Sequence, residues 1–338
     1  MSEKQEFAPK PAEGKPWDVA IIGSGPAALT AAIYTTRGAA STLIIGGESW
    51  GGQLMLTTTV DNFPGFPDGI QGPDLMNLIR KQVERFGAEF VQKNVDEVNL
   101  EKVPFELVSA GKKYLARTIV IATGADTKWL GVPGEEKLRG RGVSSCAPCD
   151  APFFKGKNVA VVGGGDSAME EALVLTKYAN TVTIIHRRDE FKASAVMQQK
   201  IFDKEKEDKV KILWNTEIVE FIGEQKLEKI KIKDSKTGEI KEVLMDGVFV
   251  AIGHIPATGM FKEKLELDER GYIIRMPTEH HEDVVEKKHF HTKTSTQGVF
   301  VSGDVHDHVY RQAVTAAGFG CMAGMDALRY LDKAVPTW

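Results

Sequence analysis

The sequence predicts an α/β fold in which one parallel-sheet domain is inserted into another of the same kind. Two segments, 18–29 and 158–169, show the same order of a run rich in Val and Ile, a glycine turn and a stretch of helix-forming residues. Short apolar runs of this kind are typical of buried parallel strands. Three later runs, 118–124, 248–253 and 298–304, are comparable strand ends. We expect each domain to contain one of these three strands, and we expect the remaining strand to return the chain to the first domain.

The domain limits follow from this repeat. Pro133 and Pro256 lie close to the two predicted joints, where a change of domain is expected. Segment 277–294 is polar and carries His280, His281, His289 and His291, so we expect an exposed loop there, with a metal site as the alternative. The predicted parts are a flexible tail over 1–16, the first part of the outer domain over 17–127, the inserted domain over 128–255 and the second part of the outer domain over 256–338.

Length and composition exclude several classes of protein. A chain of 338 residues is enough for about two domains. The 43 basic and 47 acidic residues leave a net charge of −4, which argues against a nucleic-acid-binding protein. No apolar run approaches the ~18 residues of a spanning helix, and the first 16 residues lack the apolar stretch of a signal peptide. We therefore expect a soluble cytoplasmic protein with no membrane or nucleic-acid partner.

Both glycine turns match the Gly-x-Gly-x-x-Ala pattern of Rossmann dinucleotide-binding turns. The glycines permit a tight turn and a close approach of the backbone to a pyrophosphate, and the following helix offers its first amide hydrogens. One match alone would be weak, because glycine turns are common. Two matches in the same strand-turn-helix context predict two dinucleotide sites, one at Gly23, Gly25 and Ala28 and the other at Gly163, Gly165 and Ala168.

The end of the next strand distinguishes the two sites. In the inserted domain it reads His186-Arg187-Arg188, with Lys192 further on. Arginine binds a phosphate through two parallel N–H bonds, so we expect NADPH rather than NADH. A solvated basic turn is the alternative, because two acids follow directly.

In the outer domain the corresponding strand ends in two glycines, and Glu48 is the nearest acid. This end selects no phosphate and suits a dinucleotide without a 2′-phosphate. FAD is the expected cofactor, because a flavin converts a hydride into electrons that can be delivered to sulfur.

A Cys-x-x-Cys pair, Cys146 and Cys149, precedes the second glycine turn. Such a pair in a cytosolic protein indicates redox chemistry or a metal, but zinc would need four ligands and the remaining thiol, Cys321, is isolated. We predict a redox-active disulfide and no metal site, with structural zinc or two inert buried cysteines as alternatives. A helix that begins after Cys146 would lower its pKa. Asp150 could transfer a proton to a leaving thiolate or be only an N-terminal helix residue.

The motifs together resemble those of the low-molecular-weight thioredoxin reductases from about residue 17 to residue 332. In order they are Gly-x-Gly-Pro-Ala-Ala, Gly51-Gly-Gln-Leu54, Asn62-Phe-Pro-Gly65, Ala122-Thr-Gly124, Cys-Ala-Pro-Cys-Asp, Gly-Gly-Gly-Asp-Ser-Ala, His-Arg-Arg, Ala251-Ile-Gly-His254, Gly303-Asp304 and Arg311-Gln-Ala313. The resemblance implies a homodimer that passes electrons from NADPH through FAD to the cysteine pair and then to the disulfide of thioredoxin.

The resemblance also implies a role for individual residues. Cys149 would face the flavin, Cys146 would attack the protein substrate, and Asp150 would donate a proton. Lys192 stands where the family more often has arginine. The residues expected to hold FAD are Gly23, Ser24, Gly25, Pro26, Ala27, Glu48, Gly52, Gln53, Asn62, Thr123, Gly124, Asp304, Arg311, Gln312 and Ala313. Those expected to hold NADPH are Gly163, Gly165, Asp166, Ser167, Ala168, His186, Arg187, Arg188 and Lys192.

The cysteine pair and the NADPH turn share the inserted domain, whereas the flavin is expected in the other. Reacting atoms must come within ~3.5 Å, so the nicotinamide and the disulfide cannot both lie beside the flavin. We expect the inserted domain to rotate about the joints near residues 127 and 256. The alternatives are a related flavoprotein supplied by ferredoxin or another reductant, and a non-catalytic NADP-binding redox sensor. The His-Arg-Arg motif argues against the first, and a bound flavin would argue against the second.

Overall fold

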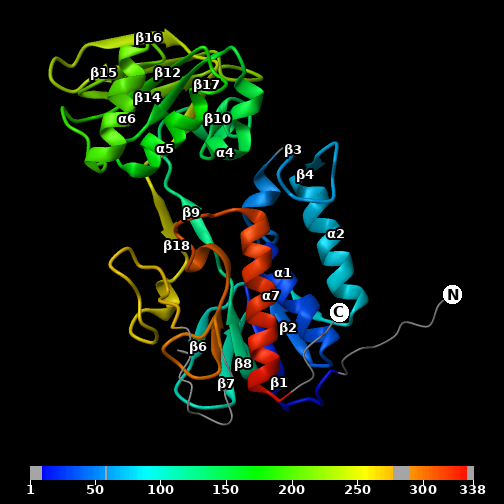
Figure 1. Ribbon diagram of the computed structural model, residues 1–338. Helices are drawn as coiled ribbons and strands as arrows, with labels where there is room; N and C mark the ends of the chain where they lie inside the picture. The colour runs from blue at the N-terminus through cyan, green and yellow to red at the C-terminus, as the bar shows by residue number, and fades with distance from the viewer. Residues whose placement is uncertain (1–9, 58, 277–289, 333–338) are drawn as a thin grey trace. The chain divides into compact units, whose positions relative to one another are not determined.

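The computed structural model describes residues 10–57, 59–276 and 290–332 (Figure 1). The chain divides into two compact units. Unit 1 combines Met1–Asp126 with Pro256–Trp338, and unit 2 is the single segment Thr127–Ile255. Most of the predicted tail and most of the histidine-bearing segment, including His280, His281 and His289, lie outside the described residues. The predicted fold class, one parallel-sheet unit inserted into another, is confirmed.

Unit 1 is built on a seven-stranded sheet whose central strands are parallel. The strand ends that face the first glycine turn are in register, since Ile22 pairs with Ile45 on one side and with Ile121 on the other. In the order of the sheet the strands are β5 (Glu89–Val91), β2 (Thr42–Ile45), β1 (Trp17–Ile22), β8 (Lys112–Ile121), β7 (Phe105–Ser109) and β6 (Glu97–Asn99), with β19 (Val299–Val301) parallel to β8.

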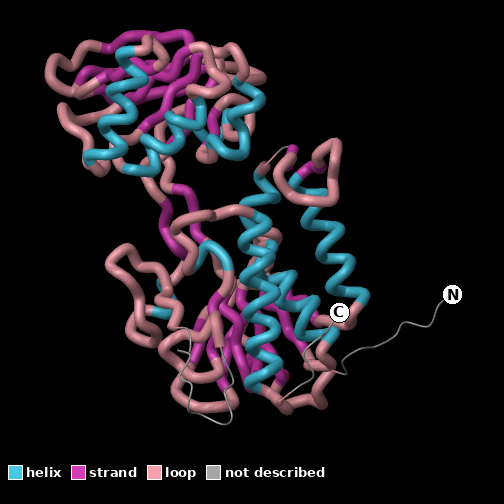
Figure 2. The backbone as a smooth tube through the Cα atoms, in the orientation of Figure 1, coloured by secondary structure: helices cyan, strands magenta, loops and turns pink. Residues whose placement is uncertain are grey.

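Alternate residues of these strands enter two cores. On one face, Val19, Ile21 and Ile44 pack against three helices, α1 (Pro26–Arg37), α2 (Gly72–Arg85) and α7 (Ala313–Tyr330). Figure 2 shows helices beside the strands of this sheet. On the other face, Ala20 and Ile22 pack among β6, β7 and the segment after η3 (Gly259–Phe261). The remaining short elements of this unit are η1 (Gly52–Leu56), β3 (Thr59–Val60), β4 (Ile70–Gln71) and η4 (Gly303–Val305).

Helices α1 and α7 lie unusually close together because α7 carries glycines where they meet. A Cβ atom on Gly320 would come within 2.2 Å of the Ala27 carbonyl oxygen, and one on Gly324 within 2.9 Å of that of Ala31. Real Cβ atoms do not make such contacts, so both positions need glycine. This packing holds the start of α1, which follows the first glycine turn, against the middle of α7.

Unit 2 repeats the arrangement with a five-stranded parallel sheet. One face is covered by helices, and the other by a three-stranded antiparallel sheet. The parallel strands, in sheet order, are β10 (Val143–Ser144), β17 (Gly247–Val250), β11 (Asn158–Val162), β12 (Thr181–Ile185) and β13 (Val210–Leu213). The antiparallel strands are β14 (Thr216–Ile222), β15 (Lys229–Asp234) and β16 (Ile240–Leu244). The helical elements are α3 (Glu135–Leu138), α4 (Ala147–Asp150), η2 (Ala151–Phe154), α5 (Asp166–Leu175) and α6 (Ala195–Lys206).

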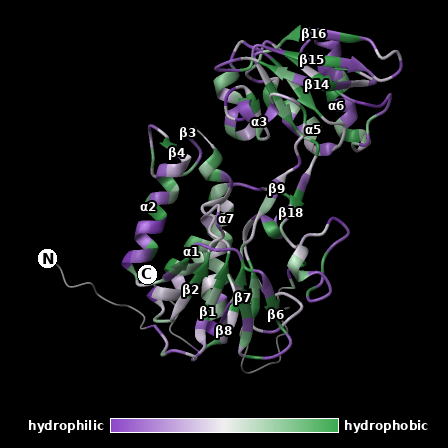
Figure 3. Ribbon diagram, turned by 180° about the vertical axis from the view of Figure 1, so that it is seen from behind, coloured by the Kyte–Doolittle hydropathy of each residue, from purple (hydrophilic) through white to green (hydrophobic). Residues whose placement is uncertain are grey.

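The chain passes between the units twice, through β9 (Ala125–Thr127) and β18 (His254–Pro256), which pair with each other. Figure 3 shows hydrophobic residues concentrated in the central strands of both parallel sheets. Among the described helices, none is long and apolar enough to cross a membrane.

Candidate functional site

The first glycine turn joins β1 to α1. Gly23 has φ +123°, and a Cβ atom there would lie 2.2 Å from the carbonyl oxygen of Ala122. Gly25 is the N-cap of α1 and has open space where its side chain would be. Ser24 donates a hydrogen bond to the Gly46 carbonyl and accepts one of 2.9 Å from the Gly51 N–H. The turn is thus fixed on one side and open on the side from which a pyrophosphate could approach.

Close contacts bring other predicted FAD residues to this turn. A Cβ atom on Gly52 would be 3.5 Å from the Gly25 Cα, and one on Gly303 would be 2.8 Å from the Ala27 Cβ. Since Ala122 contacts Gly23, the neighbouring Thr123 and Gly124 are brought to the turn as well. The structure therefore gathers residues from four separate segments, the turn itself, Gly52, 122–124 and Gly303, at the carboxyl ends of β1 and β8, where this type of sheet binds ligands.

Asp304 is a largely buried acid next to Gly303. Its Oδ1 has no hydrogen-bond partner among the described residues. Burial, assisted by the nearby Asp307, raises the pKa of Asp304 to about 7. A buried polar atom is expected to be paired, so a carboxyl oxygen without a protein partner fits a ligand hydroxyl at this position. The turn and this acid together fit a dinucleotide such as FAD.

The remaining predicted FAD residues form smaller groups. Asn62 donates a hydrogen bond of 3.1 Å from Nδ2 to the Oε1 of Gln312, which is the N-cap of α7, next to Arg311 and Ala313. Gln53 donates one of 3.1 Å to Asp126. Glu48 is exposed and paired with Lys93 at 3.0 Å, in the segment between Gly46 and Gly51, which both bond to Ser24 of the turn.

The second glycine turn, between β11 and α5, has the same construction. Gly163 has φ +153°, and a Cβ atom there would lie 2.4 Å from the Ala251 carbonyl oxygen. Gly165 is the N-cap of α5, with open space around it. At the start of this helix, Asp166 accepts hydrogen bonds of 2.8 Å from both the N–H and the hydroxyl of Ser194.

His186 lies directly beneath this turn. A Cβ atom on Gly164 would be 2.2 Å from its ring, and its Nε2 is 2.9 Å from the carbonyl oxygen of Glu190. Burial lowers the pKa of His186, and the charges of Arg187 and Arg188 lower it further. The imidazole therefore supports the turn as a neutral group.

The predicted phosphate-binding side chains are exposed. Arg187, Arg188 and Lys192 all reach solvent, and the Lys192 N–H donates a hydrogen bond of 2.7 Å to the Gly164 carbonyl. Asp189, which suggested a merely solvated turn, pairs with Lys236 at 3.1 Å, and this bond lowers its pKa. The acid is thus engaged by a lysine from another part of the unit, and the arginines are available to a ligand phosphate.

Cys146 and Cys149 form a disulfide, both half-buried, at the start of α4. The N–H groups of Cys149 and Asp150 donate to the Cys146 carbonyl at 3.2 and 3.1 Å. Cys321 is in α7 of unit 1, beside Met325. Among the described residues, no group of three or more His, Cys, Asp or Glu side chains is placed to hold a metal ion.

Asp150 is linked to the disulfide through a serine that sequence reasoning missed. The Ser144 hydroxyl donates to Asp150 Oδ2 at 2.5 Å and accepts the Cys146 N–H at 3.1 Å. Burial raises the pKa of Asp150, and the bond from Ser144 partly opposes this. Asp150 is the last residue of α4 and makes no side-chain cap bond to the η2 helix that follows. Its carboxyl is therefore engaged at the redox turn and does not cap a helix.

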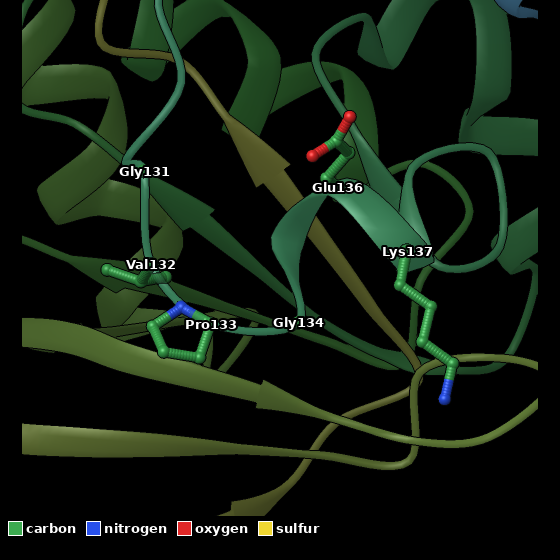
Figure 4. Close-up of a pocket in the computed structure, with 6 residues that line it drawn as sticks. All are labelled: Gly131, Val132, Pro133, Gly134, Glu136 and Lys137. Atoms are coloured by element: carbon green, nitrogen blue, oxygen red, sulfur yellow. The ribbon is translucent and has the colours of Figure 1, made fainter.

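Two shallow surface hollows in the described part of the chain lie apart from most of these residues. One in unit 2, of about 600 Å³, is lined by Gly131, Val132, Pro133, Gly134, Glu136 and Lys137 (Figure 4). It contains none of the predicted site residues. A second hollow, in unit 1, is lined by residues 61–67 and includes Asn62.

Two dinucleotide-type glycine turns and a redox disulfide define a class of nucleotide-dependent disulfide oxidoreductases. Residues 17–320 match the family described as pyridine nucleotide-disulphide oxidoreductase. The chain is 47% identical over 319 residues to thioredoxin reductase of Rickettsia conorii, with 93% of this chain and 98% of that protein covered. This chain belongs to the pyridine nucleotide-disulphide oxidoreductase family.

Solved structures agree with this placement. The crystal structure of thioredoxin reductase from Streptococcus pyogenes aligns with a TM-score of 0.84 at 39% identity, covering 94% of this chain and 98% of that one. Thioredoxin reductase from Giardia duodenalis gives 0.83 at 40% identity, with coverage of 93% and 98%. The resemblance and the enzyme class predicted from the sequence are confirmed, and the predicted cofactors FAD and NADPH agree with this family. A sensor without catalysis is not favoured.

Proposed function

We propose that this protein is a thioredoxin reductase, which carries electrons from NADPH through FAD to the Cys146–Cys149 disulfide and on to the disulfide of thioredoxin. The observation that carries the proposal is the disulfide itself, held beside a half-buried acid, Asp150, in the same unit as a glycine turn with a basic strand end. The similarity to thioredoxin reductases over 93% of the chain supports it.

Unit 1 would hold FAD. The pyrophosphate would lie at Gly23, Ser24, Gly25, Pro26 and Ala27, where the backbone is open, and a ribitol hydroxyl would pair with the buried Asp304. Gly52, Gln53, Asn62, Thr123, Gly124, Arg311, Gln312 and Ala313 would complete the site, and Glu48 would take part only if it left Lys93. When bound, FAD accepts a hydride from the nicotinamide and supplies two electrons to the disulfide.

Unit 2 would hold NADPH. Gly163, Gly165, Asp166, Ser167 and Ala168 form the turn and helix start that would receive the pyrophosphate. Arg187, Arg188 and Lys192 would surround the 2′-phosphate, with His186 supporting the turn from below. A relative supplied by ferredoxin would have no use for these cations, so they favour NADPH over that alternative.

The cysteine chemistry follows from the bonds around the pair. Reduction of the disulfide takes up two electrons and two protons. The Cys146 thiolate then attacks the disulfide of thioredoxin, forms a mixed disulfide and releases a thiolate, which Asp150 protonates. Cys149 next displaces the second thioredoxin sulfur and restores the Cys146–Cys149 bond. The raised pKa of Asp150 supports its role as the donor, because it keeps the proton on the carboxyl to higher pH.

The rest of the proposal concerns motion, assembly and location. Unit 2 rotates about the two joints, because a nicotinamide and a disulfide both need the same place beside the flavin. The chain forms a cytoplasmic homodimer. The exposed apolar side chains of Val309, Tyr310 and Val314 in unit 1 support association, since such groups are often covered in an interface.

The experiment that tests the proposal is an anaerobic titration of the FAD-loaded protein with NADPH, read in the flavin absorption bands, followed by oxidised thioredoxin. We expect NADPH to bleach the flavin and thioredoxin to restore its colour. A protein that takes up no FAD, or a bleached flavin that thioredoxin does not reoxidise, would refute the proposal.

A further inference from the structure

Two carboxylates bond to the turn that carries the disulfide, and the mechanism above uses only Asp150. The other is Glu171, on α5. Its Oε2 accepts a hydrogen bond of 2.6 Å from the backbone N–H of Ala147, the residue that follows Cys146. Ala147 is fully buried. Glu171 itself is half-buried, so its carboxylate bonds to the peptide unit attached to Cys146 where a charge acts more strongly than at the fully exposed surface.

The other ionisable groups on the elements packed against α4 are engaged elsewhere or exposed. These elements are η2 and α5. Helix η2 has no ionisable residue, whereas α5 has Asp166, Glu170 and Glu171. Asp166 accepts two hydrogen bonds from Ser194, and Glu170 is exposed. Within the described chain, Glu171 is thus the α5 residue whose carboxylate is bonded to the redox turn.

We propose that Glu171 is a positioning residue that keeps the Cys146–Cys149 pair strongly reducing. The proposal rests on the function proposed above, in which the pair must give its electrons to another disulfide. Reduction of the pair by two electrons and two protons gives two thiols, and loss of one proton from Cys146 then gives a thiolate. That ionisation stabilises the reduced form, as it does in strongly oxidising disulfides.

Glu171 opposes this ionisation in two ways. It occupies the Ala147 N–H, a donor that could otherwise stabilise a thiolate on the adjacent Cys146. It also adds a negative charge, and like charges disfavour each other's ionised forms. The helix that begins after Cys146 therefore offers the thiolate less stabilisation than the sequence suggested. A less stable reduced form gives up its electrons more readily.

The test compares the FAD-loaded full chain with Glu171→Gln, which can still accept the Ala147 N–H but carries no charge. Glu170→Gln removes the same charge from the exposed side of the same helix and is the matched control. Each protein is equilibrated anaerobically with buffers of reduced and oxidised dithiothreitol from pH 6 to pH 9. The samples are quenched with acid and alkylated, and the reduced fraction of the peptide containing both cysteines is measured by mass spectrometry.

We expect Glu171→Gln to shift the equilibrium toward the dithiol three- to tenfold at pH 9, a tenfold shift being about 30 mV for two electrons. At pH 6 both thiols keep their protons in either protein, so the shift should vanish. Alkylation of Cys146 in the reduced protein should begin at lower pH in Glu171→Gln. Glu170→Gln should follow the unaltered chain throughout.

An unchanged equilibrium at pH 9 in Glu171→Gln would overturn the proposal, and so would a shift of equal size at every pH, which would indicate altered packing. Glu171→Asp, which keeps the charge, provides a second variant and should retain the pH dependence of the unaltered chain. The measurement uses dithiothreitol, so it does not depend on thioredoxin. If the unaltered chain failed to reduce thioredoxin while the pH-dependent shift was present, the proposed function alone would fail.

Discussion

The two units start from the same glycine turn and differ in what surrounds it. Gly23 and Gly163 each lie so close to a carbonyl oxygen of a neighbouring strand end that no side chain fits. In unit 1 the next strand, β2, is followed by Gly46 and Gly47. In unit 2 the next strand, β12, is followed by the His186–Arg188 segment. Under the proposed function, the backbone turn binds a pyrophosphate in both units, and the side chains at the next strand end select the rest of the dinucleotide.

Asp304 in unit 1 and Asp150 in unit 2 are both partly buried acids with a raised pKa, but their surroundings differ. Asp304 in unit 1 has an oxygen without a partner in the described structure, and its pKa is about 7. Asp150 in unit 2 is bonded to Ser144, which links it to the Cys146 amide. The first arrangement suits an acid that pairs with a ligand, and the second an acid that transfers a proton at a fixed place.

The largest effect on thioredoxin reduction should come from Cys149→Ser, which removes the disulfide of unit 2 and leaves the predicted flavin site of unit 1 unchanged. Thioredoxin reduction should fall to background because the disulfide can no longer form, whereas NADPH should still bleach the flavin. Stopped-flow absorbance at the flavin bands measures the second step. Cys321→Ser, in α7 of unit 1, is the control and should retain both activities. Equal loss of both steps in Cys149→Ser would contradict the assigned roles.

The two glycine turns can be tested separately by substituting one glycine in each. Gly23→Ala should lose bound FAD and Gly163→Ala should lose NADPH binding while retaining FAD, because the added methyl meets a carbonyl oxygen at 2.2 or 2.4 Å. FAD content after gel filtration and the Kd for NADPH measure the two outcomes. Gly156→Ala also has a positive φ but open space, and should cost only about 1–2 kcal/mol of stability. Loss of the same cofactor in both turn variants would show that the units are not specialised.

Much of this arrangement could be predicted from the sequence, because the signals are local. The glycine spacing, the apolar runs and the Cys-x-x-Cys pair each lie within a dozen residues, and they predicted the inserted fold and the redox class. Ser144 and Glu171 could not be found in this way, since the bond from the Ser144 hydroxyl to Asp150 and the bond from the Ala147 N–H to Glu171 form only in the folded chain. The sequence likewise could not show that the Asp304 Oδ1 lacks a hydrogen-bond partner among the described residues, because the burial of this atom arises only in the folded chain.

For His186 the sequence identified the segment, and the structure adds a contact that the motif does not show. The motif predicted a nucleotide-binding residue, and the structure places the ring beneath Gly164. A sequence pattern records which residues occur together, but not which of them faces the ligand and which supports the backbone.

The basic strand end of unit 2 is tested by replacing Arg187 and Arg188 with Ala. The KM for NADPH should rise about tenfold or more, since a charged hydrogen bond contributes about 1.5–3 kcal/mol, and the KM for NADH should change less than about twofold because it has no 2′-phosphate to lose. Steady-state kinetics with both nucleotides measure this. Arg141→Ala, another exposed arginine of the unit, should alter neither value. A parallel rise for both nucleotides would remove the phosphate-binding role.

The smallest expected effect is on the pH dependence of thioredoxin reduction, and it tests the role of the partly buried Asp150. A proton donor works while it is protonated, so the rate of thioredoxin reduction should fall as the pH rises through the pKa of Asp150. Burial raises that pKa and the Ser144 hydrogen bond lowers it. Ser144→Ala leaves burial unopposed, so the fall in rate should move to higher pH, with the maximum rate within about fivefold of the unaltered chain.

The measurement is the pH profile of thioredoxin reduction by enzyme reduced beforehand. Ser145→Ala is the matched control, because this neighbouring serine bonds to Thr127 and not to Asp150. It should leave the profile in place, and Asp150→Asn should remove the alkaline fall together with most of the activity. If Ser144→Ala moved the fall to lower pH, the hydroxyl would be raising the pKa of Asp150, and the acid in unit 2 would not be the donor inferred from its surroundings.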